Sequence, residues 1–218
     1  MRIEQARFEI VSKITGEELL EQADLALEQA YQFRSKDRNK RIQTAIRLGH
    51  NEPIEFAGTI SVLFVCDRGV ANQIVRHRHS SKCQESTRYC NYSNERFGSE
   101  ISVIEPCYLA RGTKAYEVWY NSCLQAEKAY FELLDIGLLP EEARAVLPMS
   151  LTTRLAYAAN PWSWRNFFTK RCAPTAHPHG RCQGAQVIRP FPQGLPFCLR
   201  HSKCARYRGG LATLYPFW

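Results

Sequence analysis

Apolar side chains recur every three to four positions in several stretches of the chain, which is the spacing that gives a helix one apolar face. Thr15 and Asn160 are placed to cap two of these helices, and Gly137 is placed to end the longest. We therefore predict helices over residues 16–33, 39–48, 113–136 and 161–171, with shorter helices beginning near Asp67 and at Pro140.

Short runs of apolar and β-branched residues predict strands at residues 7–13, 59–66, 101–104 and 151–159. The pattern shows no internal repeat, and 218 residues are enough for one sizeable domain. From Pro174 onward the chain is rich in Pro, Gly, Arg, His and Cys without clean periodicity. We predict no helix or strand in that last part.

Composition is ordinary for a soluble globular protein, with 44% apolar and 23% charged residues. The net charge of +8 predicts an anionic partner. Because the basic residues are spread through the chain, phosphate-bearing metabolites or cofactors suit it better than nucleic acid.

No stretch reaches the ~20 apolar residues that span a bilayer, and the N-terminus has no apolar segment of signal-peptide type. We expect a cytoplasmic protein without a membrane partner. In that reducing compartment most of the nine cysteines should be free thiols. Those in apolar or mixed segments are interpreted as small core residues: Cys66, Cys90, Cys107 and Cys123.

The densest chemistry lies between Arg76 and Tyr89, directly after an apolar stretch. This run holds three arginines, two histidines and several hydroxyl or amide side chains. Fixed cations beside a core element are costly unless an anion neutralises them, and arginine pairs bidentately with phosphate. The run therefore predicts a phosphorylated ligand; the alternative is a basic loop on a solvated surface.

The order Arg76-His77-Arg78, seven residues, then Ser86 resembles the signature of the flavin-dependent thymidylate synthases. Residues 84–93, 142–148 and 160–171 resemble further blocks of that family. The resemblance implies an α+β fold with a mixed, largely antiparallel sheet flanked by helices. It places the catalytic domain at residues 1–181 and leaves a divergent Cys/Pro/Gly-rich tail at 182–218.

The resemblance also implies an activity, the reductive methylation of dUMP to dTMP. Methylenetetrahydrofolate would supply the carbon, reduced FAD the hydride, and NADPH the electrons that reduce FAD again. Arg171 would lie beside the N3/O4 edge of the pyrimidine and stabilise its deprotonated ring, so that no enzyme nucleophile is required. The family builds each active site from several subunits of a homotetramer.

The residues that the resemblance assigns fall into two sets, with Arg171 as the catalytic residue. The dUMP set is Gln73, Ile74, Val75, Arg76, Gln84, Glu85, Ser86, Thr87, Arg88, Arg144 and Arg171. The FAD set is Glu52, Arg76, His77, Arg78, Gln84, Asn160, Trp162 and Asn166, with His50 in a neighbouring histidine-containing segment.

Some of these residues have a plainer interpretation. Arg144 fits a helix surface, Asn160 fits a helix N-cap, and His50 fits an exposed or structural histidine. On the last predicted helix, helical spacing puts four residues on one face, so that the arginine is partly desolvated beside aromatic rings. These four residues are Trp164, Phe167, Phe168 and Arg171.

The chain also departs from the family pattern. Trp162 occupies the position of an arginine that helps to hold the flavin, and Phe56 occupies that of a histidine. His79 and Lys82 replace residues that are generally apolar and tyrosine. The sequence after Ala176-His177-Pro178 lacks the family's usual helical pattern.

The tail has metal-ligand spacing at Cys198, His201 and Cys204, to which Cys182 adds a fourth possible zinc ligand. The alternative is a tail with incidental thiols. Two competing hypotheses follow: a zinc-stabilised nucleic-acid-binding protein, and a flavoprotein of the same fold with impaired turnover.

Overall fold

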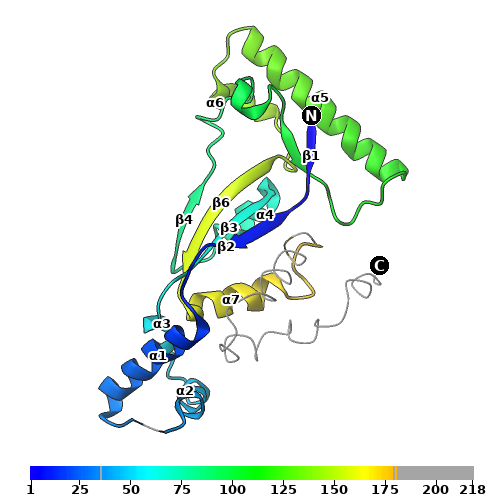
Figure 1. Cartoon of the computed structure of the whole chain (residues 1–218). Helices are drawn as coiled ribbons and strands as arrows, with labels where there is room; N and C mark the ends of the chain where they lie inside the picture. The colour runs from blue at the N-terminus through cyan, green and yellow to red at the C-terminus, as the bar shows by residue number, and fades with distance from the viewer. Residues whose placement is uncertain (35, 179, 181–218) are drawn as a thin grey trace. The chain divides into compact units, whose positions relative to one another are not determined.

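The computed structural model of the protein describes residues 1–34, 36–178 and 180. The chain divides into two compact units, each built from segments that are distant in the sequence (Figure 1). The first unit comprises Met1–Glu9, Leu63–Arg76 and Lys82–Tyr157. The second comprises Ile10–Val62, His77–Ser81 and the described residues from Ala158 onward. The chain therefore passes between the units within the basic run, after Arg76 and again after Ser81.

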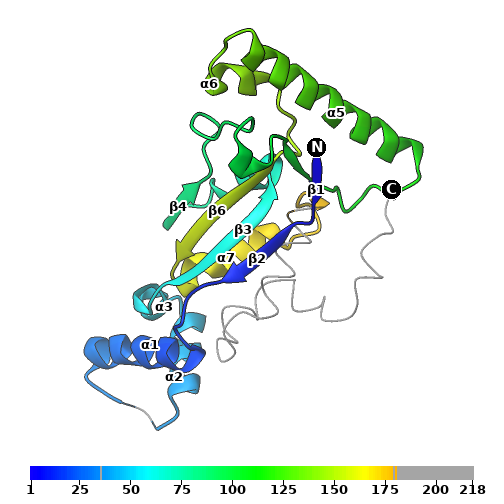
Figure 2. The same cartoon turned by 45° about the horizontal axis from the view of Figure 1, so that its top comes forward.

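Four strands form a sheet in the order β2-β3-β6-β4 (Figure 2). They are β2 (Arg7–Ile10), β3 (Ile60–Asp67), β6 (Thr152–Ala159) and β4 (Ser80–Gln84). Neighbouring strands are antiparallel, since β2 and β6 run from the first unit into the second while β3 and β4 run back. Alternate residues of β3 are buried, from Ile60 to Cys66, whereas Leu63 is 41% exposed. The sheet thus has one covered face and one open face.

The rest of the first unit is built on a two-stranded sheet and a long helix. β1 (Arg2–Glu4) and β5 (Ser102–Ile104) pair in parallel. α5 (Lys114–Asp135) buries Cys123 and Tyr130, which form a core cluster with buried residues of the surrounding segments. Those residues are Tyr92, Ile101, Val103, Ala143 and Leu151. The short elements of this unit are α4 (Arg68–Ile74), η1 (Glu95–Phe97), α6 (Pro140–Ala143) and η2 (Arg144–Val146).

Side-chain and backbone chemistry explains both ends of α5. Thr113 accepts a hydrogen bond at Oγ1 from the Tyr116 backbone N–H, at 3.3 Å. At the other end Gly137 has φ +99°, and it donates its N–H to the Leu134 carbonyl while Leu138 donates to Leu133. This is a Schellman motif, which favours glycine because a side chain is strained in the left-handed region. The predicted stop at Gly137 is confirmed.

The helices of the second unit include α1 (Gly16–Tyr31), α2 (Arg38–Arg47), α3 (Glu52–Phe56) and α7 (Pro161–Arg171). Thr15 begins α1 with the reciprocal hydrogen bonds of a capping box to Glu18. Asp24, 2% exposed, accepts a 2.8 Å hydrogen bond from Nε of Arg41, which ties α1 to α2. Removing either partner would leave a poorly solvated charge, so this ion pair fixes how the two helices pack.

The α+β class and the mixed, largely antiparallel sheet are confirmed. Each predicted helix exists within about two residues of its expected bounds. The strand predicted at 7–13 ends at Ile10, although Val11 still donates to the Ser61 carbonyl. No described helix is both long and apolar enough to cross a membrane.

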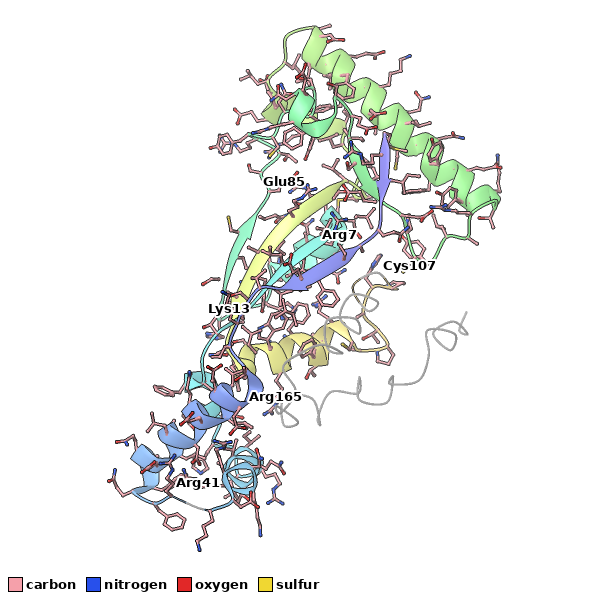
Figure 3. All side chains as sticks on the ribbon, in the orientation of Figure 1. Arg7, Lys13, Arg41, Glu85, Cys107 and Arg165 are labelled. Atoms are coloured by element: carbon pink, nitrogen blue, oxygen red, sulfur yellow. The ribbon has the colours of Figure 1, made fainter. Side chains whose placement is uncertain are left out.

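One core assignment was wrong, and four short elements were missed. Cys107 is exposed because it lies in the turn that follows β5 (Figure 3). Cys66 and Cys123 are buried as predicted, and Cys90 is half-buried. The missed elements are β1, β4, α3 and η1, which have between three and five residues. Such short segments show too few positions for a period to be recognised.

Candidate active site

In the first unit, the predicted substrate residues of one group lie on and just after α4. Gln73 is half-buried and Arg76 is exposed, but the Ile74 side chain is only 1% exposed and packs in the core. Asp67 caps α4 by accepting from the Val70 N–H at 2.7 Å. α4 therefore presents Gln73 and Arg76 to solvent while Ile74 anchors it.

The second group, residues 84–88, follows β4. Gln84 donates from Nε2 to Thr153 Oγ1 at 3.4 Å, and the Glu85 N–H donates to the Arg154 carbonyl at 2.8 Å. Ser86 Oγ accepts from the Arg88 N–H at 3.3 Å, which closes a tight turn. The segment thus leaves the sheet in a defined conformation.

Arg144 lies against this turn. Its Nη1 donates to Thr87 Oγ1 at 3.2 Å, and its Nε donates to the Glu141 carbonyl at 3.0 Å. Arg88 pairs with the Glu141 carboxylate at 2.7 Å. Among the described residues Arg144 has no carboxylate partner, so this corner of the first unit combines two guanidinium groups with hydroxyl donors. Such a set suits a phosphate.

In the second unit, Arg171 contacts the histidine of the basic run. Its Nε donates to His77 Nε2 at 2.9 Å. His77 is 4% exposed, and its ring packs on Phe167 with centroids 4.9 Å apart. Burial lowers the pKa of Arg171, but a guanidinium remains charged at neutral pH even so. The predicted aromatic face is confirmed, since Trp164, Phe167 and Phe168 are all buried.

The N-terminus of α7 is connected to α3 and to the basic run. Asn160 Oδ1 accepts from the Ser163 N–H at 2.9 Å, and its Nδ2 donates to the Glu55 carbonyl at 3.0 Å. Ser163 Oγ donates to the His79 carbonyl at 2.9 Å. Trp162 lies edge-on to the His79 ring, with centroids 5.8 Å apart. Asn160 therefore is the N-cap, and two of the departures from the family pattern, Trp162 and His79, are in contact.

The remaining members of the predicted FAD set are also in the second unit, apart from Arg76 and Gln84. Asn166 is half-buried on α7, Glu52 is the exposed first residue of α3, and Arg78 is exposed. His50 is exposed and meets the Tyr31 ring edge-on, as the plainer interpretation of this histidine expected. Within the described part of the chain neither Arg76 nor Arg78 forms an ion pair.

Two groups of site residues thus emerge, one in each unit, and the sequence missed several residues that hold them. These are Arg68, Tyr92, Glu141, Thr153, Arg154 and Ser163. Tyr92 and Ser163 belonged to recognised blocks, where nothing indicated their partners. The zinc set of Cys182, Cys198, His201 and Cys204 and the tail at 182–218 lie outside the described residues. Within the described ranges no three His, Cys, Asp or Glu side chains are grouped to hold a metal ion.

A family model described as thymidylate synthase complementing protein matches residues 6–196. The chain belongs to this family. Among curated relatives, a flavin-dependent thymidylate synthase of Geobacter sulfurreducens is 28% identical over 142 residues, or 65% of this chain and 60% of that protein. One from Pyrococcus abyssi is 29% identical over 128 residues, or 59% and 52% of the two chains. The chain therefore spans little more than half the length of these family members.

A solved structure supports the family fold. The UMP/dUMP methylase PolB of Streptomyces cacaoi, bound with 5-Br dUMP, aligns with a TM-score of 0.72 at 19% identity. The alignment covers 91% of this chain and 95% of that one. At such identity the likeness shows the fold alone.

Proposed function

We propose that this chain catalyses the FAD-dependent reductive methylation of dUMP to dTMP, with methylenetetrahydrofolate as carbon donor and NADPH as reductant. The transferred carbon is more oxidised than a methyl group by two electrons, which NADPH supplies through FAD. The products are therefore dTMP, tetrahydrofolate and NADP⁺. The observation that carries the proposal is Arg171, a partly desolvated cation held by His77 of the signature. The family membership of the chain supports the same reaction.

Arg171 would act on the pyrimidine by electrostatics. C5 of uracil is a weak nucleophile until negative charge builds on the ring at N3 and O4. A positive charge that is already oriented stabilises this negative charge without reorganising, and low polarity strengthens the effect. The rings of Trp164, Phe167 and Phe168 supply those surroundings, and the bond to His77 fixes the guanidinium plane.

The phosphate of dUMP would bind in the first unit. Arg144 and Thr87 already share a hydrogen bond, and Arg88 is one residue away, paired with Glu141. Phosphate oxygens can replace the Glu141 carboxylate as the partner of Arg88. The half-buried Gln73 on α4 and the exposed Arg76 just after it would contact the rest of the nucleotide.

The donor set fits FAD. Arg76 and Arg78 are exposed and form no ion pair within the described residues, which suits a diphosphate. The amides of Asn160 and Asn166 suit the polar edge of a flavin ring, since an amide both donates and accepts; one N–H of Asn160 is engaged by Glu55. Trp162 and Glu52 complete the proposed set with His77 and Gln84. When bound, reduced FAD would supply the hydride that completes the methyl group.

We further propose a homotetramer with shared active sites. The open face of the sheet in the first unit carries a hollow of about 640 Å³. Both apolar and charged residues line it, including Leu63, Val65, Cys83, Arg154 and Arg7. An exposed sheet face of this composition favours burial against another subunit.

The test is made on the purified full chain. Visible flavin absorption that shifts on adding dUMP, and NADPH oxidation that yields dTMP with methylenetetrahydrofolate, are the expected results. Bound flavin without dTMP would favour the flavoprotein with impaired turnover. Zinc without flavin would favour the zinc-stabilised nucleic-acid-binding protein.

A further inference from the structure

Glu85 connects the 84–88 segment to the body of the first unit. It is the residue at which the chain leaves β4 (Figure 3), and its side chain is 11% exposed. Tyr92 donates from its hydroxyl to Oε1 at 2.9 Å, and Arg154 Nη1 lies 3.5 Å from Oε2. Both carboxylate oxygens are therefore occupied by the protein itself. Glu85 therefore restrains the backbone that carries Ser86, Thr87 and Arg88.

Tyr92 is well placed to hold this carboxylate. Its side chain is buried, and its ring meets Phe97 and Tyr130 with centroids 5.3 and 5.8 Å away. Burial and the neighbouring Glu85 charge raise the pKa of Tyr92 well above its usual range. The hydroxyl therefore stays protonated and remains a donor at every pH at which the protein would work.

Arg68 ties the same point to α4. It is the first residue of that helix, and its Nη2 donates to the Glu85 carbonyl at 3.1 Å. Its backbone N–H donates to the Leu151 carbonyl at 3.1 Å, which fixes the start of α4 against the segment leading into β6. Glu85 is thus bound at its carboxylate by Tyr92, at its carbonyl by Arg68, and at its N–H by Arg154.

We propose that Tyr92 and Arg68 are positioning residues that act through Glu85 and set the distance between α4 and residues 86–88. This inference rests on the proposed function, in which Gln73 of α4, Arg76 just after α4 and residues 86–88 bind one nucleotide. A site made of two segments binds tightly only when their spacing is fixed before the ligand arrives. The hydrogen bonds of Glu85 provide that preorganisation.

The decisive variant is Tyr92→Phe, which removes one hydroxyl and keeps the ring packing. Tyr116→Phe is its matched control, since the Tyr116 hydroxyl donates to Glu105 at 2.8 Å and Glu105 keeps Arg111 as a partner. In calorimetric titration of the full chain, Tyr92→Phe should raise the dUMP Kd about tenfold, the usual effect of losing a hydrogen bond to a charged group. FAD affinity should stay unchanged, and Tyr116→Phe should leave both affinities unchanged.

Amide hydrogen exchange of the ligand-free chain tests whether the hydrogen bonds of Glu85 hold this segment, without any assumption about the ligand. Amides of residues 85–90 should exchange faster in Tyr92→Phe and not in Tyr116→Phe. Unchanged exchange, or equal acceleration in both variants, would overturn the inference. If the wild-type chain binds no dUMP, the proposed function fails, while the exchange result still shows whether Tyr92 and Glu85 hold residues 85–90 in place.

Two further variants guard against a misfolded Tyr92→Phe protein. Glu85→Leu removes both acceptor oxygens, and the double variant with Tyr92→Phe should weaken dUMP binding no more than Glu85→Leu alone, because the two residues share one bond. Arg68→Met removes the donor to the Glu85 carbonyl and should also weaken dUMP binding selectively. Additive losses in the double variant, or an Arg68→Met protein with normal dUMP affinity, would refute the inference.

Discussion

Arg171 and His77 are 94 positions apart in the sequence, yet Nε of the arginine donates to Nε2 of the histidine at 2.9 Å. A guanidinium has no acceptor and keeps its proton, so His77 must offer an unprotonated Nε2. The hydrogen bond from Arg171 thus assigns His77 as a neutral ring that carries its proton on Nδ1. The signature histidine therefore orients the proposed catalytic arginine, a role that neither motif indicated by itself.

Arg171→Ala should lower the rate of dTMP formation by at least ~10²-fold, the usual cost of removing one preorganised donor from a reacting centre. The oligomer should remain assembled, because the change deletes a side chain and leaves the aromatic face of α7 in place. Product formation by mass spectrometry and molar mass by light scattering check the two halves of this prediction.

Lys170→Ala is the matched control, since Lys170 is the exposed neighbour of Arg171 on the same helix. It should form dTMP at the wild-type rate. A normal rate in Arg171→Ala would remove the mechanistic basis of the proposed function.

Long elements could be predicted from the sequence because they repeat their signal. The helix that became α5 shows several turns of periodicity between a threonine cap and Gly137, and both ends are now explained by hydrogen bonds. β4 could not be predicted. Its residues Ser80–Gln84 are polar, and it exists because it pairs with β6, which follows some 70 residues later in the chain.

Motifs indicated which side chains carry the chemistry but gave no information on what holds them. The contact of Arg144 with Thr87 agrees with the grouping that the motifs suggested. Glu85 was assigned to dUMP by its place in the signature, whereas the structure gives it Tyr92 and Arg154 as partners. Those partners come from a loop and a distant strand, which one sequence cannot bring together.

Asn160 variants should separate helix capping from flavin binding. Asn160→Ser keeps a side-chain acceptor for the Ser163 N–H, whereas Asn160→Ala loses it and should be less stable by about 1 kcal/mol. Both lose the carboxamide, so both should weaken FAD binding to the same extent. Thermal unfolding and flavin fluorescence titration measure the two effects. FAD affinity that follows stability, with Asn160→Ser binding as wild type, would show that Asn160 is only a cap.

Trp162→Arg should tighten FAD binding about tenfold, because it would add a charge-assisted hydrogen bond to an anionic cofactor. The variant loses only an edge contact between Trp162 and the His79 ring. Trp162→Leu is the control, since it removes the ring without adding charge and should not bind FAD more tightly. Weaker FAD binding in Trp162→Arg would show instead that the indole itself holds the cofactor.

Cys66 and Cys107 should differ sharply in reactivity. Burial raises the pKa of Cys66 to about 12, so roughly one thiol in a thousand is ionised at pH 9. Cys107 is exposed in the turn after β5. Alkylation at pH 8 followed by peptide mapping should therefore label Cys107 within the time that leaves Cys66 unmodified. Labelling of Cys66 in the folded protein would show that β3 opens readily.

Leu63→Glu tests whether the open face of the sheet is covered in the assembled protein. Leu63 is 41% exposed and lines the hollow together with Cys83. A buried carboxylate without a partner is costly, so the variant should dissociate into smaller species, and Cys83 should alkylate faster than in the wild type. Leu25→Glu, at a position 48% exposed on α1, should leave the assembly intact. Light scattering decides, because a Leu63→Glu protein with the wild-type mass would place the subunit contacts elsewhere.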